Sequence, residues 1–335
     1  MKRRVISVAA LQCLTSLALL TICADLAYAE TNRVNLFPKL HAGQTLSYQI
    51  SYHSDKQVNT QSSVTVANAP DSAKVDVRAL LRCEVLRVEP KGERALIHAR
   101  THFQILDSGS RTKIPTTQPS AAQVQPENPD SKSVEFTILP QGGIDQVKGL
   151  DDLLPEQQQA WHEWASRFAI ATTLPLGGMK IDQKWKSEEG EKSPSPIARL
   201  HWLRESTYVR DEPCRAMQMT AQGDLADPGA ESDTCAVILT TAALKQRSSP
   251  QNATPEDFKL HELRTMGTAQ GANRIITYIS LTTGLIVRAS EEANQQMDVT
   301  VAKSDGSNRV RYGVNAKSRS EILLVSETPM SKPVP

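Results

Sequence analysis

The sequence predicts a mainly β protein: a large antiparallel sheet or half-barrel, or two β-rich halves, with one amphipathic helix near residues 155–170. Three observations lead to this fold class. Many stretches alternate apolar and polar residues with a period of two, which is typical of half-buried strands. Turn residues separate these stretches at regular intervals. A single segment repeats its apolar residues with clear helical spacing.

The first 29 residues have the layout of a secretory signal peptide. The basic start Lys2-Arg3-Arg4 precedes an apolar run over residues 5–23, and the segment closes on the small-x-small sequence Ala27-Tyr28-Ala29. We therefore expect cleavage between Ala29 and Glu30, and a periplasmic or extracellular location. Cleavage changes the formal net charge from +1 to about −1, because it removes three basic residues and one acidic residue. This balance argues against nucleic acid as a partner, since nucleic-acid binding requires a basic surface.

Three other interpretations of this start are weaker. Lipidation at Cys23 would require a small residue before it, where the sequence has the bulky Ile22. A twin-arginine signal at Arg3-Arg4 usually has a polar, uncharged residue in the place of Lys2. An uncleaved anchor is disfavoured because the apolar run is short and ends near Asp25. We expect no transmembrane segment after cleavage.

Residues 30–150 form the predicted N-terminal β-rich half. Its strands are expected at Gln44–His53, Val75–Val85, Ala95–Ile105 and Val134–Leu139. A turn at Glu89-Pro90-Lys91-Gly92 joins the second strand to the third. Residues 107–132 are rich in Ser, Thr, Gln and Pro, a composition that cannot build a core, and predict a flexible loop.

Residues 151–174 contain the predicted helix. Pro155 suits a first helical turn, and Trp161, Trp164, Ala165 and Phe168 recur at i, i+3, i+4 and i+7. The two tryptophans are candidates for a ligand platform, but an aromatic stripe with this spacing more often packs on a core. We interpret it as the face that contacts the sheet.

Residues 175–327 predict a C-terminal β meander, and residues 328–335 a disordered tail. The expected strands of the meander are Ile197–Tyr208, Arg215–Ala221, Ala236–Lys245, Ile275–Leu281, Leu285–Ala289, Met297–Val301, Val310–Val314 and Ile322–Val325. Short strands separated by turn signals favour one antiparallel sheet, a barrel or a sandwich.

Three cysteines remain after signal cleavage, in a compartment where disulfides persist. Cys214 and Cys235 are the nearest pair and are expected to bridge. Cysteines that open both strands of one hairpin would lie at opposite ends, so the bridge requires Cys214 to lie near a strand end or bend. The sequence Glu212-Pro213 favours such a bend. Cys83 lies on the apolar face of its strand and is expected to be a buried thiol.

No catalytic, cofactor-binding or metal-binding residues emerge from the motifs. Ser110 to Lys113 fits an S-x-x-K pattern, but the accompanying K-T-G element is absent. His98 and His102 share a strand face about 13 Å apart, too far to bind one metal ion. The adjacent acids Asp151-Asp152, Glu188-Glu189 and Glu291-Glu292 are interpreted as solvated. Enzymatic activity stays undecided, and a non-enzymatic role is favoured.

The stretch from Arg274 to Ala302 runs through Ile-Ile-Thr-Tyr-Ile-Ser-Leu, the turn Thr282-Thr283-Gly284, and Gln296-Met297-Asp298. It resembles the strand-turn-strand segments of uncharacterised exported β-rich bacterial proteins. This last third also resembles half-barrel lipoprotein-carrier families. That resemblance implies a curved antiparallel sheet that holds a hydrophobic ligand over a helix.

Three functional hypotheses follow. The first is an exported cell-envelope or secreted protein that acts without catalysis, by surface interaction or assembly with an envelope protein. The second is a binder or carrier of a lipid or other hydrophobic ligand in a sheet cavity. The third is a hydrolase with an unrecognised site. None of the three requires a cofactor.

The signal peptide gives a direct prediction. When the full chain is expressed in a bacterial host, intact-mass analysis of the exported protein should find a polypeptide that begins at Glu30. Replacing Ala27 and Ala29 with bulky residues should block this cleavage. A lipid adduct on Cys23 would contradict it.

Overall fold

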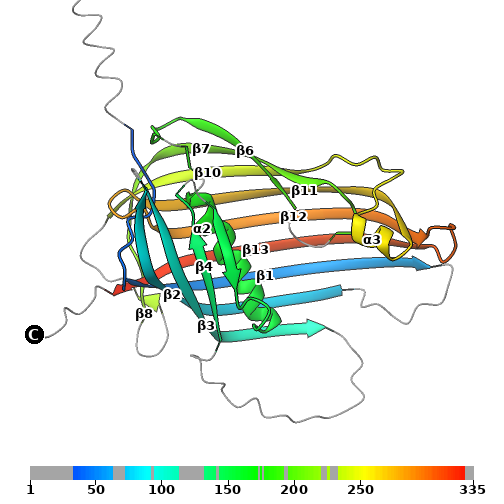
Figure 1. Cartoon of the computed structure of the whole chain (residues 1–335), viewed down its shortest axis with the longest axis horizontal. Coiled ribbons are helices and arrows are strands. Elements are labelled where there is room, and N and C mark those ends of the chain that lie inside the picture. Colours follow the sequence, from blue (N-terminus) through cyan, green and yellow to red (C-terminus); the bar gives the residue numbers. More distant parts are fainter. Residues whose placement is uncertain are drawn as a thin grey trace, which may run out of the picture.

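Eleven antiparallel strands form one sheet in the computed structural model of this protein (Figure 1). The structure describes residues 33–62, 72–91, 94–112, 132–140, 143–172, 174–175, 177–191, 195–219, 225–226 and 233–328. The strands of the sheet are β1 Thr45–Ser62, β2 Ser72–Lys91, β3 Arg94–Thr112, β4 Ser133–Ile138, β5 Ile144–Lys148, β6 Lys184–Gly190, β7 Leu200–Cys214, β10 Asp233–Gln246, β11 Leu263–Ser280, β12 Ile286–Lys303 and β13 Val310–Thr328. The predicted mainly β fold with a large antiparallel sheet is confirmed.

The chain enters this sheet at its middle and leaves it there. The strand order is β5-β4-β3-β2-β1-β13-β12-β11-β10-β7-β6. The first five strands therefore run outward from the centre to one edge, and the later strands return from the other edge. β1 pairs with β13 along its full length, from Thr45 opposite Thr328 to Ser62 opposite Val310. This ladder joins the N-terminal and C-terminal strands into one sheet.

Helix α2, Pro155–Thr172, connects the two edges by crossing one face of the sheet (Figure 1). It contacts β1, β2, β3 and β12. Its bounds agree with the predicted helix. A second, short helix, α3 Glu256–Leu260, precedes β11. Among the described residues, no helix has the length and hydropathy needed to cross a bilayer.

Several strands are longer than predicted. The segments predicted at 285–289 and 297–301 are one strand, β12, and the last two predicted strands are both part of β13. Apolar alternation lapses between them because this stretch of the sheet buries little on either face: in β12 Asn294 and Gln296 are exposed, and Gln295 is only half-buried. Backbone pairing continues there without the apolar signal.

Other boundaries are corrected as well. Residues 107–112 of the predicted loop belong to β3; the loop's residues 113–131 lie outside the described residues. Of the strand predicted at 215–221, Gln218–Met219 is a strand (β8), which pairs with Leu225–Ala226 (β9); residues 215–217 are not a strand, and 220–221 lie outside the described residues. The edge strands β5 and β6 were not predicted, because both are short and largely exposed.

A disulfide joins Cys214 and Cys235, whose Cα atoms are 5.7 Å apart. β7 ends at Cys214, and β10 begins at Asp233, which lies opposite it. The two cysteines therefore flank the same end of the β7–β10 pair, as the geometric requirement demanded. Cys83 is a buried free thiol, and burial raises its pKa to about 12.

The bridge should stabilise the fold measurably. In the chain beginning at Glu30, replacing Cys214 and Cys235 with Ser should lower the free energy of unfolding by about 3 kcal/mol, because the bridge closes a loop with a sequence separation of 21. Urea unfolding of the two proteins measures the difference. Thiol titration in denaturant is the control: one thiol, that of Cys83, should react before reduction and three after it. Three thiols without reduction would contradict the bridge.

Candidate functional site

The two faces of the sheet are distinguished by α2. Arg167 of α2 forms an ion pair with Glu291 of β12 and donates from Nη2 to Oγ of Ser320 in β13, 3.3 Å away. We call the face that carries Glu291 and Ser320 the inner face, and the opposite one the outer face. Side chains alternate along a strand. Residues 293, 295, 297 and 299 of β12, and 312, 314, 316 and 318 of β13, therefore also lie on the inner face.

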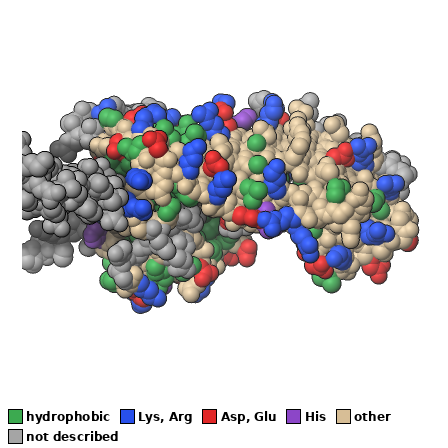
Figure 2. Space-filling view, turned by 90° about the horizontal axis from the view of Figure 1, so that it is seen from above, with side chains coloured by type: hydrophobic (Ala, Val, Ile, Leu, Met, Phe, Trp, Pro, Cys, Tyr) green, Lys and Arg blue, Asp and Glu red, His purple; other side chains and the backbone are tan. Residues whose placement is uncertain are grey.

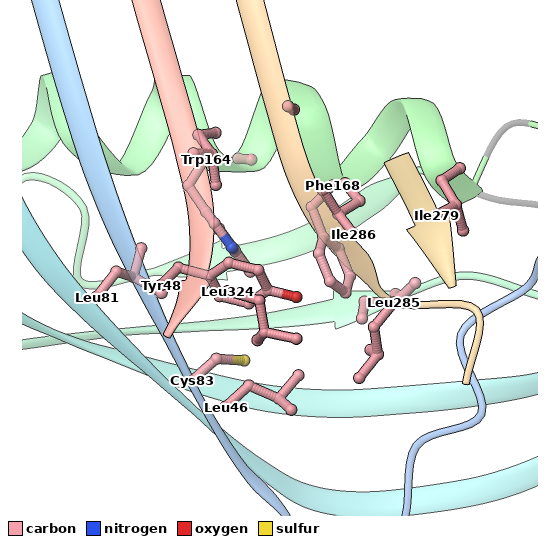
Figure 3. Packing of buried hydrophobic residues seen from close by; sticks show 14 of the residues in the cluster. Leu46, Tyr48, Leu81, Cys83, Trp164, Phe168, Ile279, Leu285, Ile286 and Leu324 are labelled. Atoms are coloured by element: carbon pink, nitrogen blue, oxygen red, sulfur yellow. The ribbon is translucent and has the colours of Figure 1, made fainter. Parts of the chain in front are cut away.

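Beneath α2 the inner face is filled by packed hydrophobic side chains (Figure 3). Trp164 and Phe168 of α2 are each 1% exposed. The ring centroid of Trp164 lies 6.3 Å from that of Tyr48 in β1 and 5.4 Å from that of Phe136 in β4. Trp161 is buried too and packs on Phe136 at 6.1 Å. The aromatic stripe is thus a core face, and it occupies the place where a sheet cavity would be.

Charged and amide side chains mark the edge of this core. We call them the polar border: Glu163, Arg167, Arg204, Asn273 and Glu291. Arg167 is 4% exposed and contacts both Glu163 and Glu291. Asn273 donates from Nδ2 to Oε1 of Glu291 at 2.6 Å. A network of this kind is stable in a low dielectric only when its charges are paired.

Arg167 is the most buried charge of the polar border. Burial lowers the pKa of its guanidinium; Glu163 opposes this shift, and the neighbouring Arg204 adds to it. Arginine nevertheless stays protonated, because its ordinary pKa lies far above neutral pH. Arg204 is itself paired, donating from Nη1 to Oε2 of Glu189 in β6 at 2.6 Å.

The polar border has unused hydrogen-bonding capacity. Nε of Arg167, Nε of Arg204 and Oδ1 of Asn273 are buried without a hydrogen-bond partner. Native proteins pair the great majority of such atoms with protein, water or ligand. Two donors and one acceptor within one contiguous cluster are therefore left unpaired, and all three atoms are buried.

Beyond the polar border the inner face is not covered by α2. Five of its half-buried apolar side chains form what we call the inner patch: Val58, Trp202, Met297, Tyr312 and Val314. Val314 lies directly opposite both Val58 and Met297 in the strand register, so the patch is continuous across three strands. Deeper residues at this end form a second hydrophobic cluster, comprising Ile197, Leu200, Leu244, Ala253, Ala269 and Val299.

Small residues separate the polar border from the inner patch. Gly271, Ala293 and Ala316 lie on the inner faces of three adjacent strands and are half-buried. A Cβ atom built on Gly271 would lie 3.2 Å from the Trp202 ring and 3.0 Å from the carbonyl oxygen of Asn294. Glycine therefore lets the indole lie close to the sheet. At these three positions, the side chains between the polar border and the inner patch rise little above the sheet.

The outer face is lined by paired charges. A pocket of about 740 Å³ at one end contains the Arg311–Asp298 ion pair together with Thr268, Thr300 and Arg309. A smaller pocket of about 280 Å³ contains His53 and Asp76, whose Nδ1 and Oδ1 atoms are 2.5 Å apart. These two side chains are 52% and 59% exposed, so they resemble the other surface ion pairs.

The surface seen from above, at 90° to the view of Figure 1, also carries charges of both signs. Figure 2 shows lysine and arginine side chains interspersed with acidic ones, and hydrophobic side chains only in small groups. A broad hydrophobic docking surface is not visible on this side.

The structure separates the histidine candidates from one another. His98 and His102 have different carboxylate neighbours, Glu89 at 3.5 Å and Glu84 at 4.0 Å. In the part of the chain that is described, no three metal-ligating side chains converge. Ser110 lies in β3, and Lys113, Ala29 and Glu30 lie outside the described residues.

One interpretation of the acidic pairs is wrong. Glu292 is solvated and paired with Arg319, but Glu291 faces inward and is 12% exposed on its side chain. Neighbours on a strand point to opposite faces, so adjacent acids in a strand cannot share one environment. Arg167 was missed altogether. Its signal was its position on the flank of the aromatic stripe, four residues after Glu163.

Comparison with known proteins yields only low-scoring similarities to solved structures. No family model and no curated protein matches this sequence. Lipovitellin, in a structure concerned with its lipid–protein interactions, has 10% identity and a TM-score of 0.38, with 88% of this chain and 27% of lipovitellin covered. The chain thus spans about a quarter of lipovitellin's length.

Two bacterial structures align over their whole length. A candidate lipoprotein of Parabacteroides distasonis has 8% identity and a TM-score of 0.29, with 89% of this chain and 100% of that one covered. A candidate exported protein of Bacteroides fragilis with a YmcC-like fold has 10% identity and a TM-score of 0.28, with 88% and 100% covered. Similarities at this level carry no argument about function.

The ion pair between Arg167 and Glu291 should contribute far more to the free energy of unfolding than a surface ion pair does. Replacing Arg167 with Met should lower the free energy of unfolding by about 3–5 kcal/mol, because Glu291 would then be buried without its cation. Adding Glu291→Gln should recover part of the loss. The control is Arg319→Met, which breaks a pair whose side chains are 74% and 69% exposed and should cost less than about 1 kcal/mol. Equal losses in urea unfolding would contradict this assignment.

Proposed function

We propose that this chain is an exported binding protein that holds the apolar part of an amphiphilic ligand on the inner face of its sheet, beyond α2. The role is non-catalytic, and the site of action is the periplasm or the extracellular space, to which the signal peptide directs the chain. Compared with the hypotheses from sequence, this function is closest to the hydrophobic-ligand binder. It differs in that the ligand lies on an open surface.

The inner patch is the observation that carries the proposal. Aromatic, methionine and branched side chains remain half-buried there, whereas α2 covers the other end of the inner face, and Leu244 and Val299 are buried in the second hydrophobic cluster. When a ligand covers apolar groups that are partly in contact with water, the removal of this area from water favours binding by roughly 25 cal/mol per Å². Aromatic residues and methionine are also the residue types that binding surfaces favour.

The size of the inner patch favours a small amphiphile over a protein. Three neighbouring strands spaced about 4.8 Å apart, with two inner-face residues along each, give a surface on the order of 200 Å². A stable protein–protein interface needs about 800 Å² from each partner. An acyl chain fits the smaller area, and the polar border beside it suits a headgroup.

A charge on the inner patch should weaken this binding. We expect the chain beginning at Glu30 to bind a sixteen-carbon amphiphile, such as 1-palmitoylglycerol, and to retain it in native mass spectrometry. Val314→Asp should weaken binding at least about tenfold, because a carboxylate would have to lose its hydration against the acyl chain.

Asn315→Asp is the matched control. It introduces the same charge one residue away on the same strand, but on the exposed outer face, and should leave the affinity unchanged. Equal effects of the two substitutions would show that the inner patch is not the binding surface. Absence of any bound amphiphile would refute the proposed function itself.

A further inference from the structure

We propose that the polar border selects the headgroup of the ligand, and that it prefers a neutral headgroup with hydroxyl or amide groups over an anionic one. This inference rests on the proposed function, in which the acyl chain lies on the inner patch. The evidence is the combination of unpaired polar atoms, local charge balance and position on the sheet.

The unpaired atoms define what the headgroup must offer. Nε of Arg167 and Nε of Arg204 are donors, and Oδ1 of Asn273 is an acceptor. The orientation of the Asn273 amide is fixed by its neighbour, because Nδ2 donates to Glu291; the reverse orientation would place oxygen against a carboxylate. A group that both accepts and donates hydrogen bonds would satisfy these atoms, as a hydroxyl or an amide does.

The charges around the polar border disfavour an anion. Arg167 and Arg204 face three carboxylates, Glu163, Glu189 and Glu291, so the cluster has one excess negative charge. Each guanidinium is already paired: Arg167 with Glu163 and Glu291, and Arg204 with Glu189. A carboxylate or phosphate headgroup would compete with these pairs and would be repelled by the acids in a low dielectric. A neutral headgroup meets neither cost.

Lys56 is the rival anchor for an anionic headgroup. It lies opposite Ala316 in the register of β1 and β13, on the inner face, and is exposed. Its charge is therefore well solvated, and an ion pair with it would contribute little at physiological salt. Lys56 is an exposed cation of the inner face that would attract a fatty acid, so it provides a clear alternative to test.

The position of the polar border completes the argument. In the strand register Asn273 lies opposite Ala293, and the next inner-face residue of β12, Gln295, lies opposite Ala316. The row of Met297 and Val314 lies four residues along the strands from the row of Asn273. At about 3.3 Å per residue, the two rows are about 13 Å apart. The inner-face residues of the intervening row are Gly271, Gln295 and Ala316, and an acyl chain can extend past Gln295 over the two small ones. One amphiphile can therefore place its headgroup at the polar border and its acyl chain on the inner patch.

The test compares two ligands with the same chain, 1-palmitoylglycerol and palmitate, by native mass spectrometry and calorimetric titration near neutral pH. The chain beginning at Glu30 should bind 1-palmitoylglycerol at least about fivefold more tightly. Asn273→Ala should weaken binding of 1-palmitoylglycerol about fivefold, the factor expected for one neutral hydrogen bond, with little effect on palmitate. Arg204→Lys keeps the charge and removes Nε, and should reduce the same preference.

Controls separate this inference from the proposed function. Asn294→Ala, on the exposed outer face of β12, and Lys56→Gln should leave the preference unchanged. Thermal unfolding of each variant shows whether it is folded. Tighter binding of palmitate, lost in Lys56→Gln, would overturn the inference in favour of an anionic ligand. Equal affinities that do not respond to Asn273→Ala or Arg204→Lys would show that the polar border only holds α2. If neither ligand binds, the proposed function fails instead.

Discussion

The buried ion pair between Arg167 and Glu291 determines how much of the sheet α2 covers. Hydrophobic packing alone is non-directional and would tolerate a helix displaced along the strands. A buried ion pair opposes such a displacement, because it would leave a guanidinium or carboxylate buried without its partner, which is strongly unfavourable. The pair therefore fixes the helix over one end of the sheet, with Glu163 and Ser320 completing the contacts of Arg167.

The position of α2 divides the inner face into two parts with different roles. Under the helix, Trp164 and Phe168 fill the space against Tyr48 and its neighbours, so that end contributes stability. Beyond the polar border α2 no longer covers the strands, and Val58, Met297 and Val314 stay half-buried beside the second hydrophobic cluster. One sheet thus provides both its own core and an open surface. The outer face instead carries exposed ion pairs such as Arg311–Asp298.

Much of the fold could be predicted from local patterns. Period-two alternation located the buried parts of β2, β3, β10 and β11, and the aromatic stripe located α2. The bridge between Cys214 and Cys235 followed from proximity and from the proline before Cys214. Prediction failed where local patterns carry little information: the polar middle of β12, the exposed edges β5 and β6, and the inward orientation of Glu291, which depends on a contact with a helix more than 120 residues earlier.

The sequence alone determined most of the strand-forming segments and the helix with its apolar face, because these depend on residues close together in the chain. The tertiary structure decided the pairing of β1 with β13, the place of α2 on the sheet, and the meeting of Arg167, Glu291, Asn273 and Arg204. Those features depend on contacts between residues far apart in the chain, whose register is set by burial and by backbone pairing. The polar border and the inner patch exist only once that register is fixed.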